Sequence, residues 1–179
     1  TNMKFLLLFV AISAHAEDML PTKVHNDLET KPVPEGCTRL KVGESAVINL
    51  SDSESPTGMG AHYGLSRFSE DTYIVELNER FIPGKDLSET MKGSALQTNY
   101  RNRVAACFKE YEGILKNERS GKRLLIRHTD NPSVPVWEIT IHENLPRADS
   151  KSYRMGMPCA TVLHETLHIL GLPDEYFEK

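Results

Sequence analysis

Apolar and polar residues alternate with a period of two in two parts of this chain, and that rhythm predicts β-strands. The first part covers residues 73–77 and the second covers residues 136–142. In the second, Trp137, Ile139 and Ile141 share one face while the other face is polar. We expect a strand there with one face in water, as at the edge of a sheet.

Two other parts repeat apolar residues every three to four positions, which predicts amphipathic helices. The first helix is expected from about residue 94 to before Gly121, and its apolar positions are Leu96, Tyr100, Val104, Phe108, Tyr111 and Leu115. The second is expected over residues 158–170, since Pro158 suits a first turn and Gly171 suits a C-terminal cap. Between them, the apolar run at residues 124–126 predicts a buried strand.

Residues 17–70 show fewer signals of regular structure. One strand is expected at residues 46–50, and the serine-rich run at residues 51–56 indicates a loop or linker. Glycines surround His62 and Tyr63, but no Gly-Lys-Ser/Thr follows them as in a phosphate-binding loop. We therefore expect a flexible loop around these two residues.

The composition is typical of one globular domain. The chain has 179 residues, of which 39% are hydrophobic and 26% charged, so wholesale disorder is not expected. With 21 basic and 25 acidic residues, the formal net charge of -4 argues against a basic nucleic-acid-binding protein. No sequence feature indicates binding of nucleic acid or of an organic cofactor.

The most apolar stretch of the chain lies close to its N-terminus and is too short to span a membrane. Lys4 precedes it and an A-x-A pattern at residues 14–16 follows it, which is typical of a secretory signal peptide. Thr1 and Asn2 have the character of a short remnant ahead of the first methionine. Residues 1–16 therefore predict a secreted or periplasmic protein with no stable membrane anchor after signal cleavage.

Three cysteines, Cys37, Cys107 and Cys159, allow at most one intramolecular disulfide, and their order alone leaves the pair open. Cys159 is expected to be buried or paired with Cys107. The sequence contains no C-x-x-C, which argues against a zinc ribbon and a thioredoxin-type redox site. For Cys37 a structural or disulfide role is favoured over an inhibitory thiolate on a metal.

The second predicted helix contains the sequence His164-Glu165-Thr166-Leu167-His168. Residues four apart lie on one face of a helix, so both imidazoles can reach a single Zn²⁺ at roughly 2.0–2.1 Å. Glu165 lies about 100° round the helix from His164. Its carboxylate can therefore act as a general base on a zinc-activated water.

A catalytic zinc needs a third protein ligand. Gly171 can end the helix in a left-handed conformation and Pro173 prevents the helix from resuming, so Asp174 is the expected ligand. Glu175 is the alternative. Two further histidines, His128 and His142, lie on or beside predicted strands without a partner at ligand spacing, and we interpret them as surface or rim residues.

Residues 164–174 read HETLHILGLPD, which resembles the HExxHxxGxxD variant of the metzincin clan of zinc metallopeptidases, as in snapalysin-like enzymes. The Asp174-Glu175-Tyr176 that closes the segment is similar to secreted bacterial peptidases related to the IgA-peptidase group. The resemblance covers about 15 residues. It implies a metzincin-like α+β fold, in which a mixed sheet has a backing helix and a second helix carries the active site.

The same resemblance implies an endopeptidase with Zn²⁺ held by His164, His168 and Asp174 and with Glu165 as the catalytic residue. Its partner would be a peptide or protein substrate, which in this clan adds as an extended strand to a sheet edge, a role open to residues 136–142. Residues 71–179 are then the zinc metallopeptidase catalytic domain, and residues 17–70 an N-terminal extension or candidate propeptide.

Metzincins carry a methionine turn beneath the metal, downstream of the third ligand. Met155 and Met157 lie upstream of it, and the sequence ends at Lys179, so we expect the C-terminal subdomain to be missing or minimal. Two alternatives therefore stay open. One is a non-catalytic exported zinc-binding or interaction domain, and the other is a zinc amidase that acts on cell-wall peptides.

Overall fold

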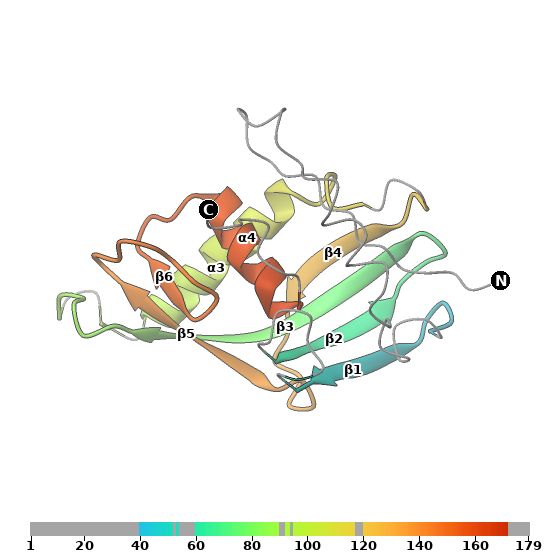
Figure 1. Ribbon diagram of the computed structural model, residues 1–179, viewed down its shortest axis with the longest axis horizontal. Helices are drawn as coiled ribbons and strands as arrows, with labels where there is room; N and C mark the ends of the chain where they lie inside the picture. The colour runs from blue at the N-terminus through green and yellow to red at the C-terminus, as the bar shows by residue number, and fades with distance from the viewer. Residues whose placement is uncertain are drawn as a thin grey trace.

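The computed structural model describes residues 40–51, 53, 60–89, 92–93, 95–116 and 120–171, which form a mixed sheet of six strands and two helices (Figure 1). The strands are β1 (Ser45–Leu50), β2 (Ala61–Arg67), β3 (Thr72–Pro83), β4 (Arg123–His128), β5 (Val136–His142) and β6 (Ser152–Arg154). The helices are α3 (Ala95–Glu110) and α4 (Cys159–Ile169). The predicted α+β class is confirmed.

The long strand β3 is the centre of the sheet. β4 pairs in parallel with residues 72–77 of β3, and β5 pairs in parallel with residues 78–83. β6 continues the parallel part beside β5, whereas β2 and β1 add in antiparallel orientation. Strands from the predicted N-terminal extension therefore belong to the same sheet as the strands that follow them.

The four predicted strands all exist, and the alternation in β5 buries the residues that were expected to be buried. Trp137, Ile139 and Ile141 are enclosed, whereas Glu138 is exposed. The edge position is wrong for the second half of β5, because β6 pairs with residues 140–142 on the side away from β3. The one solvated face of β5 therefore does not require a free edge.

The flexible loop expected around His62 and Tyr63 is wrong, because both residues belong to β2. Gly64 explains why the strand is hard to recognise from sequence. A Cβ at this glycine would lie 3.1 Å from Cβ of Glu76 and 3.2 Å from Cγ2 of Val134. A glycine inside a strand often marks such a close approach, and it removes one position from the apolar alternation.

Both predicted helices exist and pack on the sheet and on each other (Figure 1). α3 is shorter than expected and ends at Glu110, although Tyr111 and Leu115 beyond it stay buried. Of the disulfide pairs left open, the structure contains the one between Cys107 on α3 and Cys159 at the start of α4. This cross-link joins the two helices over the sheet.

Several predictions fall on residues outside the described ranges. These are the signal peptide at residues 1–16, Cys37, and the segment after Gly171 that includes Asp174 and Glu175. Among the helices that the structure describes, none combines the length and the apolar character that a bilayer crossing requires.

Candidate metal centre

The two histidines of the HExxH sequence lie one turn apart on α4. The Nε2 atoms of His164 and His168 are 3.2 Å apart, and their rings meet nearly at right angles with centroids separated by 4.7 Å. Glu165, between them in sequence, is buried. The expected common face of the two imidazoles is therefore present.

The separation of these two nitrogens suits a single zinc ion. Two ligands at roughly 2.0–2.1 Å from a tetrahedral metal, about 109° apart, are separated by about 3.3 Å. The Nε2 atoms of His164 and His168 already lie 3.2 Å apart. This distance also lets one ring donate its Nε2–H to the Nε2 of the other ring.

Gly171 ends α4 as the sequence predicts. Its φ angle of 88° is the left-handed conformation, and its N–H donates to the carbonyl of His168 at 2.9 Å. The helix therefore ends within one turn of the second histidine. Asp174 as the third ligand lies outside the described residues, among which no group of three or more His, Cys, Asp or Glu side chains is arranged to hold a metal.

Beneath α4 lies a buried polar residue that sequence reasoning missed. Tyr153 on β6 is fully enclosed, and its hydroxyl is 3.5 Å from Oγ1 of Thr166 on α4. Burial raises the pKa of Tyr153 well above its ordinary value, and the charges of Glu79 and Glu165 raise it further. The phenol therefore stays protonated, within electrostatic reach of two buried carboxylates.

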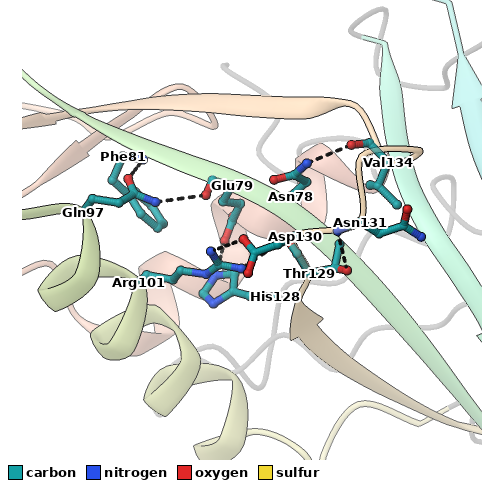
Figure 2. A network of polar contacts seen from close by, with 10 residues as sticks. All are labelled: Asn78, Glu79, Phe81, Gln97, Arg101, His128, Thr129, Asp130, Asn131 and Val134. Carbon is teal, nitrogen blue, oxygen red and sulfur yellow. Dashed lines mark hydrogen bonds and ion pairs between the residues drawn. The ribbon is translucent and has the colours of Figure 1, made fainter.

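His128 is not the surface residue that was expected. Its Nε2 lies 2.5 Å from Oε2 of Glu79, and the two side chains are 7% and 0% exposed (Figure 2). The parallel pairing of β4 with β3 brings the end of β4 beside β3, and the imidazole packs against Phe81 and Phe108. The one feature of the sequence that could have predicted the burial of Glu79 is its place two residues after Leu77. At that spacing it lies on the same inward face of β3 as Tyr73, Val75 and Leu77.

Oε1 of Glu79 has no hydrogen-bond partner among the described residues. A pocket of about 340 Å³ lies nearby, and its lining includes Glu79, Gln97, Arg101 and Asp130. Arg101 and Asp130 are already engaged, because Arg101 pairs with Asp130 at 2.6 Å and donates to the carbonyl of Thr129 (Figure 2). The Glu79 carboxylate instead interacts with His128 and raises the pKa of the buried Tyr153.

His142 lies at the rim, as expected, but it has a partner. Its Nδ1 is 2.9 Å from Oδ1 of Asp86, and Oδ2 of Asp86 accepts the backbone N–H groups of Glu143 and Asn144. The hydrogen bond from Asn144 has the largest effect on the pKa of Asp86 and lowers it; burial opposes this shift, and the hydrogen bond from His142 lowers the pKa further. This cluster joins the ends of β3 and β5. It contains one histidine, whereas the histidine pair with metal-ligand spacing lies on α4.

No family model, curated protein or solved structure matches this chain. The functional interpretation therefore rests on the chemistry of its own residues.

Proposed function

We propose that this protein is an exported zinc-dependent endopeptidase of metzincin-like fold, and that His164, His168 and Asp174 hold the metal. The observation that carries the proposal is the pair of Nε2 atoms 3.2 Å apart on one helical face, next to a buried glutamate. The left-handed turn at Gly171 supports a third ligand from the residues that follow. The mixed sheet with two helices packed on it is compatible with an α+β fold of this kind.

Each residue has one task in this mechanism. Zn²⁺ in this site supplies Lewis acidity, which makes water a usable nucleophile near neutral pH. Glu165 takes a proton from the attacking water and delivers it to the leaving amine as the peptide bond breaks. Burial of Glu165 limits the hydration of its carboxylate.

The disulfide between Cys107 and Cys159 supports the export part of the proposal. Disulfides form and persist in oxidising compartments and are rare in the cytosol. The same compartment is expected from the signal-peptide pattern at residues 1–16. A secreted or periplasmic location is therefore consistent with both features.

The direct test is the Glu165→Gln variant. Because the amide cannot accept the proton, we expect peptide hydrolysis to fall by at least about 100-fold. The variant should still bind about one Zn²⁺ per chain, since Glu165 is not a ligand in this proposal. A peptide-library assay measures hydrolysis, and elemental analysis measures zinc.

The matched control is His164→Ala, which should lose both zinc and hydrolysis. Full activity in Glu165→Gln would exclude this mechanism. Zinc binding by the parent chain without hydrolysis of any peptide would favour the non-catalytic alternative, and cleavage confined to cell-wall peptides would favour the amidase.

A further inference from the structure

No capping side chain marks the N-terminal end of α4, the helix that carries the two histidines. Its N-cap residue is Pro158, which makes no side-chain capping bond, and the first turn contains no acidic residue. Ser, Thr, Asp or Asn at this position would satisfy a free backbone N–H. α4 also has only 11 residues, a length at which an isolated helix is marginal in water. Tertiary contacts must therefore hold its start.

Those contacts come from three side chains of α3. The Tyr100 hydroxyl donates to the carbonyl of Arg154 at 2.8 Å, and Arg103 donates to the carbonyl of Met157. Cys107 forms the disulfide with Cys159, the first residue of α4. The three residues are spaced by three and four positions, so they lie along one face of α3. They contact the connection from β6 to α4 in the same order as it runs.

We propose that Tyr100, Arg103 and Cys107 are positioning residues, which set where α4 begins and which way its histidines face. The inference rests on the proposed function in one respect, because the histidines matter as metal ligands. If the next residue in sequence occupied the anchored position at the start of α4, every later residue of the helix would be rotated by about 100° and moved by about 1.5 Å relative to the sheet. Such a change would remove both imidazoles from their common site.

The positive charge of Arg103 indicates that this residue fixes the position of α4 and does not stabilise α4 as a helix. A cation beside the N-terminal end of a helix opposes the helix dipole. Arg103 nevertheless donates to the carbonyl of Met157, two residues before α4 begins. Its contribution is therefore to the path of the connection.

The experiment compares Tyr100→Phe and Arg103→Gln with the parent chain, each metal-free and then titrated with Co²⁺. Each variant loses a hydrogen bond to the connection into α4, so we expect amide hydrogen exchange in α4 to rise about fivefold while exchange in β1 stays unchanged. Co²⁺ affinity should fall by a similar factor. Its visible absorption spectrum reports the ligand geometry, which a general loss of stability would not alter. Arg103→Lys keeps a donor and should recover most of the affinity.

Arg101→Gln is the matched control. This residue lies on the same helix and pairs with Asp130, not with the connection into α4, so exchange in α4 should stay at the parent value. Unchanged α4 exchange and Co²⁺ binding in Tyr100→Phe and Arg103→Gln would overturn the inference. A parent chain that binds no Co²⁺ would instead contradict the proposed function, and hydrogen exchange would still test the anchors.

Discussion

At the scale of single residues, the packing of β2 against its neighbours depends on Gly64, which has no Cβ. Gly64 faces Glu76 of β3 in the register of the two strands, and Val134 lies against it. A methyl group would meet both side chains at 3.1–3.2 Å, closer than ordinary van der Waals contact. The neighbours would have to move by a few tenths of an ångström, which would weaken the pairing of β2 with β3.

We therefore expect Gly64→Ala to lower the free energy of unfolding by about 1–3 kcal/mol. Urea unfolding measures the change. Gly113→Ala is the control, since a Cβ there meets no atom within 4 Å, and its effect should be much smaller. A neutral Gly64→Ala would mean that Glu76 and Val134 move aside at no cost.

At the scale of elements, one carboxylate joins the ends of two parallel strands. Asp86 follows β3 and accepts hydrogen bonds from His142 at the end of β5 and from the backbone of Glu143 and Asn144. The N–H of Gly84 also donates to the carbonyl of Ile141 at 2.7 Å. The two strand ends are therefore held together by side-chain and backbone contacts.

This carboxylate predicts a pH dependence of stability with a definite sign. Hydrogen bonds from Asn144 and His142 keep the pKa of Asp86 below its ordinary value in the folded state. Its charge therefore stabilises the fold above the unfolded pKa of about 3.9, and this stabilisation is lost as the pH falls through the lower folded pKa. In Asp86→Asn the deficit in melting temperature should be largest near neutral pH and shrink below about pH 4. A deficit of constant size from acid to neutral pH would contradict this account.

At the scale of the whole molecule, a single covalent bond connects the two helices. Cys107 and Cys159 are separated by 52 residues, which include β4, β5 and β6. Closing a loop of this length restricts the unfolded chain strongly. The cross-link therefore affects the stability of the entire domain as well as the start of α4.

We expect the Cys107→Ala, Cys159→Ala double variant to lose about 4 kcal/mol of unfolding free energy, from the entropy of that loop. Urea unfolding of the parent chain reduced with a phosphine provides the comparison. Both forms should lose a similar amount. A loss below about 1 kcal/mol in both would mean that the disulfide contributes little beyond the hydrogen bonds around it.

Local patterns were enough to predict the strands β1, β3, β4 and β5 and the helices α3 and α4. β3, β5 and the two helices depend on a period of two or of three to four residues, and β4 depends on a short apolar run; neighbours in sequence carry both signals by themselves. The shared face of His164 and His168 and the left-handed Gly171 were predictable for the same reason, because both belong to one helix and its end. Asp174 as the third ligand stays a prediction.

Partners that are distant in sequence decided the rest. β2 depends on contacts of Gly64 with two other segments, and the burial of His128 depends on Glu79, 49 residues away. The choice of Cys107 as the partner of Cys159 depends on α3 packing against the start of α4. Periodicity determines which face of an element is apolar, but the meeting of two faces is a property of the packed chain, so these contacts were settled only by the tertiary structure.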